Sequence, residues 1–576
     1  MNSFKSLYRC YSPYKNRLWI GIVALFLVDI FHLFIPRIIK YAIDGITKGT
    51  ITKTDLFRYA LLIVALAIVV SILRFFWRYY IIGTSRKIEE QIRNKLFAHI
   101  QNMDMKFFNN HKIGDLMAHA TNDVNAIRET LGHGMIQFLD IIIWGPFSLA
   151  FMLFISVKLT LFAIIPLPFV SIMIMRFSKL IYTRFKNVQA SFSALTANAR
   201  ENIEGIKVIK VFNQENGEIS NFTDKSQDYM DKNMRLTQIH SIFSPMIFFF
   251  TSISTAIVLL VGGKYVISHA ISMGDLVAFM SYLATFIWPT IAIGLLLNTI
   301  QRGSASMSRI NEILNTLPEI KAPSDPVEIK TISNVKKLEI VNLDFYYKEK
   351  HVLDNINLSL NAGDSLGITG KIGSGKTTFL NLITRLYDPD KGEIKLNDVS
   401  LKNIPFDNLR KVVSFVPQDS FLFSDTIFAN IAFGKPHATL EEVQTVAKIA
   451  KIHDEIMSFP NNYYDVIGER GVTLSGGQCQ RVALSRALLL NPDVLIIDNA
   501  LASIDIEKEM EILHNLRHTL KDKILIVVSH RIRSIMESDK IIVLEHGKIT
   551  EKGNHNELLA LQGIYFHLFR YQEFNK

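Results

Sequence analysis

Residues 367–378 read GITGKIGSGKTT, and this stretch decides the fold of the C-terminal half of the chain. Within it, residues 370–377 fit the phosphate-loop pattern G-x-x-x-x-G-K-[ST]. Backbone N–H groups of such a loop cradle phosphates, while the lysine (Lys376) pairs with the β and γ oxygens and the hydroxyl of Thr377 binds Mg²⁺. The pattern therefore predicts that this half of the chain binds a nucleoside triphosphate together with Mg²⁺.

A second element of the same chemistry lies further along, where the apolar run VLIID ends at Asp498. The carboxylate of Asp498 offers another oxygen for the metal. The next residue is Asn499, in the place where hydrolysis of ATP needs a base to polarise the attacking water. An amide can hold a water but cannot accept its proton, and general-base catalysis is typically worth about 10²–10⁴-fold. We expect binding of ATP with slow turnover at this site.

The N-terminal half has the composition of a membrane domain. A stretch of about 20 apolar residues spans the hydrocarbon core of a bilayer. Prolines at positions 318, 323 and 326 then mark a linker, after which short apolar strands alternate with helical segments. We predict a transmembrane domain at 1–317, a linker at 318–335 and a nucleotide-binding domain at 336–576. The predicted spans lie near 18–39, 57–81, 136–156, 159–177, 243–262 and 276–300.

The overall composition excludes several other classes of function. Half of the chain (49%) is hydrophobic, and the mean hydropathy is +0.21. The net charge of +10 is spread along the chain and forms no basic patch, so we expect no nucleic-acid partner. The chain has two cysteines, Cys10 and Cys479, which are too few for a disulfide framework or a cysteine metal site.

Lysine and arginine residues indicate the orientation in the membrane. They are frequent before the first span and in the two long loops at about 82–135 and 178–242, and rarer in most of the short loops. Because positive loops stay on the cytoplasmic side, both termini and both long loops are expected there. The first apolar stretch is long enough to remain in the bilayer and shows no cleavage site. We therefore expect a multi-pass integral membrane protein.

An ordered set of motifs accompanies the phosphate loop: VPQD at 416–419, LSGGQ at 474–478, Asp505, and VSH at 528–530. With six spans ahead of it, this set resembles ATP-binding cassette (ABC) transporters, and the whole chain resembles an exporter-type half-transporter. The resemblance implies a membrane domain of six long helices. It also implies an α/β P-loop ATPase domain with an antiparallel β subdomain and a helical subdomain.

The resemblance also implies roles for particular residues. Tyr347 would stack on adenine, Gln418 would contact Mg²⁺, and His530 would contact the γ-phosphate. Asp505 would organise the interface between two ATPase domains, and turns near Lys112–Met117 and Phe212–Gly217 would couple each domain to the membrane. The implied catalytic set is Asn499, His530 and Gln418, with Thr377, Gln418 and Asp498 on Mg²⁺. The implied ATP set is Tyr347, Gly370, Gly373, Ser374, Gly375, Lys376, Thr377, Thr378, Asp498, Ser475, Gly476, Gly477, Gln478 and Asp505.

Asn499 bears on the partner of this chain. In the family that it resembles, Ser475–Gln478 reaches the ATP held by the other subunit, so two chains share two sites. An intact signature beside a missing base favours a heterodimer whose second half-transporter supplies the glutamate. A homodimer with two impaired sites is the alternative. An inactivated protein, or another group acting as the base, are further interpretations.

The membrane half indicates less about the substrate. Charged side chains inside a bilayer are costly and normally face a cavity or a partner. Asp29, His32 and Asp140 are the candidate substrate contacts, with an ion pair between Asp140 and Arg74 or Arg78 as the structural alternative.

The leading functional prediction is export of an amphipathic small molecule, drug, lipid or peptide across a bacterial cell membrane, with membrane lipid as a further partner. An importer with the exporter fold is one alternative. A nucleotide-gated regulator or channel, in which little hydrolysis is needed, is another.

Overall fold

The computed structural model describes residues 2–323, 334–468, 471 and 473–574. Contacts divide the chain into two compact units. The helical unit comprises Met1–Asn102 and His111–Leu317, and the α/β unit comprises Met103–Asn110 and Pro318–Lys576. Most of the predicted linker at 318–335 lies outside the described residues, because 324–333 are not among them.

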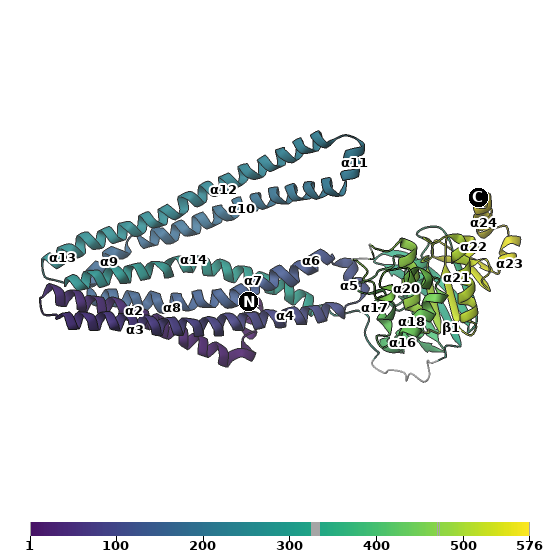
Figure 1. Cartoon of the computed structure of the whole chain (residues 1–576), viewed down its shortest axis with the longest axis horizontal. Helices are drawn as coiled ribbons and strands as arrows, with labels where there is room; N and C mark the ends of the chain where they lie inside the picture. The colour runs from purple at the N-terminus through teal and green to yellow at the C-terminus, as the bar shows by residue number, and fades with distance from the viewer. Residues whose placement is uncertain (1, 324–333, 469–470, 472, 575–576) are drawn as a thin grey trace. The chain divides into compact units, whose positions relative to one another are not determined.

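The helical unit consists of long rods that run side by side (Figure 1). Short wider turns at 78–82, 119–123, 130–134 and 258–262 join consecutive helices without ending the rods. The helices are α1 (Asn2–Arg9), α2 (Lys15–Thr47), α3 (Lys53–Trp77), α4 (Gly83–Gln101), α6 (Ile113–Ala118), α7 (Val124–Glu129), α8 (Met135–Ile155), α9 (Val157–Ile164), α10 (Leu167–Glu204), α11 (Ile206–Val211), α12 (Glu215–Ile257), α13 (Gly263–Ile267) and α14 (Met273–Asn315).

Among the described residues, five continuous helical segments are long and apolar enough to cross a membrane, one fewer than the sequence predicts. The predicted span at 159–177 falls instead on α9 and the start of α10. The apolar helical segment described there, Val157–Val170, runs across Pro166, a residue that lacks the N–H of a helix interior but is tolerated at a helix start. The helix accordingly ends at Ile164, and α10 begins directly after the proline. The five segments are Ser6–Thr47, Lys53–Gln101, Ile113–Ile155, Glu215–Ile267 and Met273–Asn315.

Helices α10 and α12 are much longer than a bilayer crossing requires. They contain 38 and 43 residues, against about 20 for a span. They pack along each other and are joined by the short helix α11 (Figure 1). The predicted coupling turn at Phe212–Gly217 lies at this junction. The other predicted coupling turn, at Lys112–Met117, overlaps α6 and belongs to the helical unit. The neighbouring segment Met103–Asn110 is part of the α/β unit.

The α/β unit contains two sheets. A six-stranded sheet has the order β10-β9-β3-β8-β7-β6, in which β10 alone pairs antiparallel, and a four-stranded antiparallel sheet has the order β2-β1-β4-β5. The strands are β1 (Lys337–Tyr347), β2 (Lys350–Asn361), β3 (Ser365–Thr369), β4 (Lys391–Leu396), β5 (Val399–Ser400), β6 (Val413–Val416), β7 (Val494–Asp498), β8 (Ile524–Val528), β9 (Lys540–Glu545) and β10 (Lys548–Gly553).

Helices cover both faces of the six-stranded sheet (Figure 1). The helices of the α/β unit are α5 (Met105–Asn110), α15 (Lys376–Ile383), α16 (Phe406–Val412), α17 (Ile427–Ile431), α18 (Leu440–Ile449), α19 (His453–Met457), α20 (Gly476–Leu489), α21 (Ile506–Thr519), α22 (Ile532–Ile535), α23 (His555–Ala560) and α24 (Ile564–Phe574). Helices α17 to α20 pack on one another as a helical subdomain.

The central strands are buried throughout, as expected for parallel strands covered on both faces. Successive residues of a strand point to opposite faces. In β7, Leu495 and Ile497 accordingly enter one hydrophobic core, while Val494 and Ile496 enter the other. Because β3, β6, β7 and β8 are parallel, the loops that follow them meet at one edge of the sheet, where the candidate site lies.

Candidate nucleotide site

The phosphate loop follows β3 and leads into α15. Gly370, Gly373 and Gly375 have φ angles of +148°, +79° and +103°, which side chains other than hydrogen rarely allow. At Gly370 a Cβ would also lie 2.2 Å from the carbonyl oxygen of Leu544. Glycine is therefore required for the loop to turn. The backbone N–H groups of this turn can form an anion-binding concavity next to a helix N-terminus.

Lys376 lies inside this loop. Its side chain is buried, and its Nζ donates hydrogen bonds to the carbonyl oxygens of Gly370 at 2.9 Å and Lys371 at 2.8 Å. Burial lowers the pKa of Lys376, an effect that the nearby Asp498 carboxylate opposes. The ammonium is thus held where the phosphate oxygens of a nucleotide would bind. Phosphate would offer it a stronger, charged acceptor than either carbonyl.

Asp498 and Thr377 form the candidate Mg²⁺ site. Asp498 ends β7, is 2% exposed, and interacts through a hydrogen bond with Thr377. Its Oδ2 is enclosed by protein and has no hydrogen-bond partner within the described part of the chain. Burial raises the pKa of Asp498, opposed by Thr377, Lys376 and His530. A buried carboxylate oxygen and a hydroxyl are hard donors that suit Mg²⁺, which usually keeps several waters as well. These residues fit the ion.

Asn499 follows directly and is half-buried. Its backbone adopts φ +48° in the left-handed region, and its N–H donates to the carbonyl oxygen of Val528 at 2.9 Å. Asparagine is one of the few non-glycine residues that often adopt this conformation. The backbone of β8 therefore fixes the position of this residue at the sheet edge. Its side chain carries no group that can accept a proton from water at neutral pH.

Gln418 and His530 extend from neighbouring loops at the same edge. Gln418 follows β6, and His530 follows β8, and both side chains are exposed. Desolvation by the surrounding protein and the Lys376 ammonium lower the pKa of His530, although Asp498 opposes them. The predicted γ-phosphate contact is therefore expected to be a neutral imidazole at pH 7.

Tyr347, the predicted adenine contact, ends β1. Its ring makes edge-to-face contacts with Phe345 (4.9 Å between centroids) and Tyr387 (5.5 Å), and it is 37% exposed. Such contacts hold a ring upright at the surface. The Tyr347 ring is thus held in one orientation and remains partly exposed to solvent.

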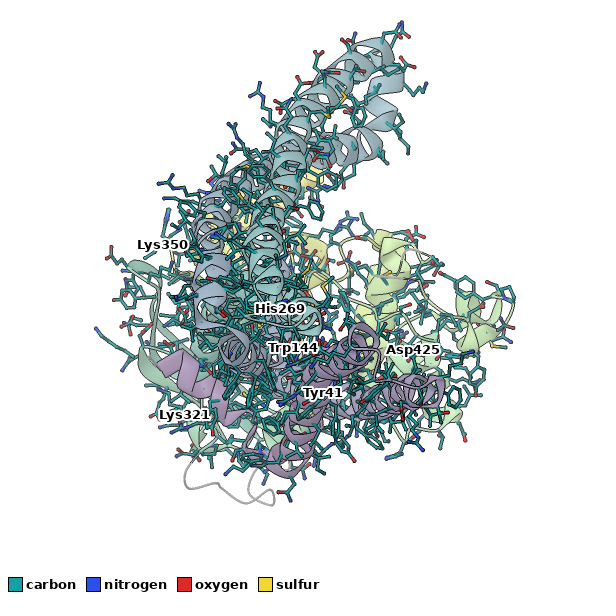
Figure 2. All side chains as sticks on the ribbon, turned by 90° about the vertical axis from the view of Figure 1, so that its left-hand side faces the viewer. Tyr41, Trp144, His269, Lys321, Lys350 and Asp425 are labelled. Atoms are coloured by element: carbon teal, nitrogen blue, oxygen red, sulfur yellow. The ribbon has the colours of Figure 1, made fainter. Side chains whose placement is uncertain are left out.

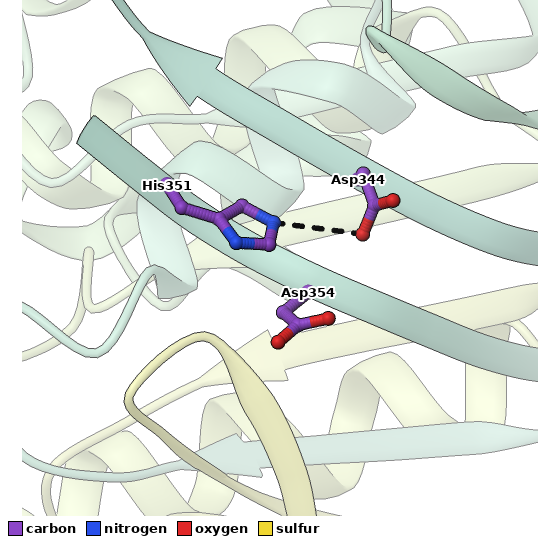
Figure 3. A group of neighbouring side chains, drawn as sticks. All are labelled: Asp344, His351 and Asp354. Carbon is purple, nitrogen blue, oxygen red and sulfur yellow. Dashed lines mark ion pairs between the residues drawn. The ribbon is translucent and has the colours of Figure 1, made fainter. Parts of the chain in front are cut away.

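Three side chains on β1 and β2 also have metal-binding chemistry. The ligand atoms of Asp344, His351 and Asp354 all lie within 4.8 Å of one another (Figure 3). His351 pairs with Asp344 at 3.5 Å, but Lys548 already pairs with Asp354 at 2.9 Å. The group therefore acts as an ion-pair cluster that ties β1 to β2.

The predicted signature segment begins α20. Ser475 caps the helix: its Oγ accepts from the N–H of Gln478 at 3.3 Å, and its own N–H donates to Oε1 of Gln478 at 2.8 Å. Ser475 and Gly476 are exposed, whereas Gly477 is buried against the carbonyl oxygen of Ser503. The reciprocal capping leaves a well-formed helix N-terminus of a kind that binds phosphate.

In the helical unit, the predicted substrate residues lie on two helices. Asp29 on α2 is 1% exposed, and its Oδ2 has no hydrogen-bond partner within the described residues. His32 stacks on Trp144 of α8, with ring centroids 5.4 Å apart and 17° between planes. Figure 2 shows Trp144 among these helices. Asp140 is an electrostatic neighbour of Asp29, and Asp140 forms no ion pair with Arg74 or Arg78 in the described structure.

Comparison with known protein families matches the membrane half and the nucleotide-binding half of the chain separately. Residues 18–290 match the family model for the ABC transporter transmembrane region, and residues 353–502 match the one for ABC transporter. The multidrug resistance-like ATP-binding protein MdlA of Escherichia coli (strain K12) is 36% identical over 569 residues, which cover 98% of this chain and 96% of that protein. The chain belongs to the ABC transporter family.

Other comparisons agree with this assignment. The probable multidrug resistance ABC transporter ATP-binding/permease protein YheI of Bacillus subtilis (strain 168) is 35% identical over 564 residues, covering 98% of this chain and 96% of YheI. A bacterial Atm1-family ABC exporter solved with ATP bound shares the fold, with a TM-score of 0.81 at 24% identity and coverage of 97% and 99% of the two chains. The predicted family and fold class are confirmed. The protein is a multi-span membrane protein with a fused ATP-binding domain.

Several residues of this ABC chain hold the motif segments in place, although they belong to none of the motifs recognised in the sequence. Glu455 on α19 binds Arg481 and accepts a hydrogen bond from Gln478 at 3.0 Å, which anchors the signature helix. Burial would raise the pKa of Glu455, but hydrogen bonds from Arg481 and Gln478 lower it to about 2.

The segment before Asp505 has a similar anchor. Arg531 donates to the carbonyl oxygens of Ala502 and Ile504, both at 3.0 Å, and pairs with the buried Glu509. Asp505 itself occupies the N-cap position of α21, with its side chain largely exposed. Only the tertiary structure reveals this support, because Arg531 and Asp505 are far apart in sequence.

Proposed function

We propose that this chain is one half of an ATP-driven exporter, in which two chains hold ATP between them and the chain's own site hydrolyses slowly. The observation that carries the proposal is the contrast between Asn499 and its surroundings. Lys376, Thr377 and Asp498 provide what ATP and Mg²⁺ need, while the position of the base holds an amide. Binding and turnover are therefore separable at this site.

The geometry of the signature segment supports a second chain. Ser475 and Gly476 are exposed at the N-terminus of a 14-residue helix, which favours an anion. Among the described contacts, none joins this helix start to residues 370–377 of the same chain. A phosphate at Ser475 would then come with the nucleotide of a partner. We propose a heterodimer, in which the partner chain carries a glutamate at the position of Asn499.

The class of substrate rests on relatives and on the helical unit. MdlA and YheI carry multidrug resistance in their names. We propose that this chain likewise exports amphipathic small molecules, drugs or lipids. Asp29, with its enclosed oxygen, and the neighbouring Asp140 favour substrates with a positive or polar group. Replacing Asp29 by Asn keeps its shape and removes its charge, so export of a cationic dye should fall while export of a neutral one persists.

The remaining assignments follow from charge and composition. We propose that the protein lies in a bacterial cell membrane with both termini in the cytoplasm. The domain boundaries at 317 and 336, and the ATP and Mg²⁺ roles of the residues above, belong to the same proposal. Labelling single introduced cysteines near Lys5 and near Lys264 from each side of the membrane would test the orientation.

The experiment that tests the main proposal is co-purification from the native membrane. The tagged chain is solubilised gently, and the proteins that elute with it are identified by mass spectrometry. A second half-transporter with glutamate at the Asn499 position is the expected result, together with ATPase activity that substrate stimulates. A self-dimer alone would overturn the heterodimer. Nucleotide-dependent conductance without turnover would replace the exporter with a nucleotide-gated channel.

A further inference from the structure

Arg17, at the start of α2, has no ion-pair partner in the part of the chain that the structure describes. Its guanidinium lies 5.7 Å from the ring centroids of both Tyr79 and Tyr80. Its Nε is enclosed by protein and has no hydrogen-bond acceptor, and none of the ion pairs among the described residues includes Arg17. An enclosed donor without an acceptor is destabilising. Arg17 as a whole is half-buried, and no hydrogen bond among the described residues uses its other N–H groups, so these can donate to an oxygen from outside the chain.

A groove begins beside this charge. It has a volume of about 400 Å³ and lies between α2 and α3, with Trp19, Val23 and Leu27 on one side and Leu73 and Phe76 on the other. All of the residues that line it are apolar. Because the lining residues recur every three or four positions along each helix, the groove follows the helix axes.

The length of the groove matches one leaflet of a bilayer. Arg17 and Leu27 are ten residues apart, and a helix rises about 1.5 Å per residue. The groove with its charged end thus extends roughly 15 Å, about half of the ~30 Å hydrocarbon core. Tyr79 and Tyr80 follow Phe76 by one helical turn, so the rings and Arg17 close the same end of the groove. Aromatic residues of this kind are typical of the membrane interface.

The charged residues in the segments around Arg17 favour a negatively charged ligand. Residues 1–28 contain no aspartate or glutamate, and neither do residues 56–88. The same segments contain further basic residues, among them Lys15, two positions before Arg17, and Arg78, the residue before Tyr79. A guanidinium in such surroundings favours phosphate, to which its planar N–H groups can donate in parallel.

We propose that the groove between α2 and α3 binds one anionic phospholipid, with its phosphate on Arg17 and an acyl chain along Trp19, Val23 and Phe76. With the orientation proposed above, this lipid belongs to the cytoplasmic leaflet. The site is separate from Asp29 and from the nucleotide residues. Its occupation holds α2 and α3 together at their cytoplasmic ends.

Native mass spectrometry of the full-length complex tests this assignment. The purified complex is titrated with phosphatidylglycerol or with phosphatidylcholine of the same acyl chains. We expect phosphatidylglycerol to be retained more tightly, and Arg17→Ala to weaken its retention about tenfold, the usual effect of losing a charge-assisted hydrogen bond. Val23→Trp, which fills the groove, should weaken the retention of both lipids.

The matched control is Arg58→Ala, at the other end of α3, where Arg58 pairs with Asp55 and is largely exposed. This variant should retain lipid like the unmodified protein. Arg17→Lys, which keeps the charge, should show an intermediate effect and guards against misfolding of Arg17→Ala. Equal retention of the two lipids, or an Arg17→Ala variant that behaves like Arg58→Ala, would overturn the proposal. So would a photoreactive residue at position 23 that crosslinks to protein instead of lipid, because a second chain would then cover the groove.

Discussion

The Nζ of Lys376 donates a hydrogen bond to the carbonyl oxygen of Gly370, 2.9 Å away, so that the phosphate loop is closed by its own lysine. A nucleotide must exchange this bond, and the one to Lys371, for bonds to phosphate. Because the lysine is already inside the loop, it needs little rearrangement to do so. This pre-positioning makes Lys376 the residue on which ATP affinity should depend most.

Lys376→Ala should therefore weaken ATP binding at least about tenfold, the effect of losing a charge-assisted hydrogen bond. Titration calorimetry with a non-hydrolysable ATP analogue would measure it. Lys371→Ala is the control, since that side chain is largely exposed and pairs with Glu545. Equal losses in both variants would contradict the assigned role of Lys376.

Asn499→Glu should raise the ATPase rate of the assembled transporter, by up to about 10²-fold if a base is all that the site lacks. The left-handed backbone at position 499 should make this variant about 1 kcal/mol less stable. Asn499→Gln matches the length and the strain but supplies no base. If it raised the rate equally, or if neither variant did, another group would be the base.

Gly477 and Gly476 offer a matched pair in the signature helix. A Cβ at Gly477 would lie 3.0 Å from the carbonyl oxygen of Ser503, whereas one at Gly476 would lie 3.6 Å from the Cβ of Ser503. Gly477→Ala should lower the free energy of unfolding by about 1–2 kcal/mol through overpacking. Gly476→Ala should leave it unchanged or raise it slightly, because alanine favours helix. Chemical denaturation followed by fluorescence would compare them, and a reversed order would refute the packing.

Because of Glu455, the free energy of unfolding should fall as the pH is lowered. Its pKa in the folded state is about 2, below its ordinary value of 4.5. The stabilisation is therefore complete above about pH 5 and is lost as the pH falls through 4.5 towards 2. Glu455→Gln should lower the unfolding free energy at pH 7 by about 1 kcal/mol, a value reduced by partial exposure, and flatten this acid dependence.

Thermal unfolding between pH 3 and pH 7 would measure this dependence. The control is Glu441→Gln on α18, where the glutamate is exposed and lacks an ion pair within the described structure. An acid dependence that Glu455→Gln leaves unchanged would show that other carboxylates produce it.

Arg531→Ala should loosen the segment that ends at Asp505. It removes two hydrogen bonds to Ala502 and Ile504 and leaves Glu509 buried beside Ser534 without its cation. We expect a loss of about 2 kcal/mol in stability, less than for a fully buried pair because Arg531 is partly exposed. Arg533→Ala, on the helix α22 that follows Arg531 and without an ion pair in the described part of the chain, should cost little. Recovery of stability on adding Glu509→Gln to Arg531→Ala would identify the buried charge as the cause.

Local sequence patterns were sufficient to predict a helical membrane domain followed by a nucleotide-binding domain. The glycine pattern at 370–377 and the apolar runs predict their own conformations, because loop chemistry and helical hydrophobicity depend on neighbouring residues. The span at 159–177 stays a prediction, since the apolar segment described there covers Val157–Val170 and includes Pro166.

The sequence by itself determined the family, the fold class and the identity of the candidate ATP residues, since these follow from short motifs in a fixed order. Their roles remain predictions. Only the tertiary structure decided what supports them, namely the contacts of Arg531 with Ile504 and of Glu455 with Gln478, and it alone placed Arg17 against Tyr79 in the helical unit. These pairs join segments that are far apart in the chain. The order in which strands and helices pack sets them, and no local spacing records that order.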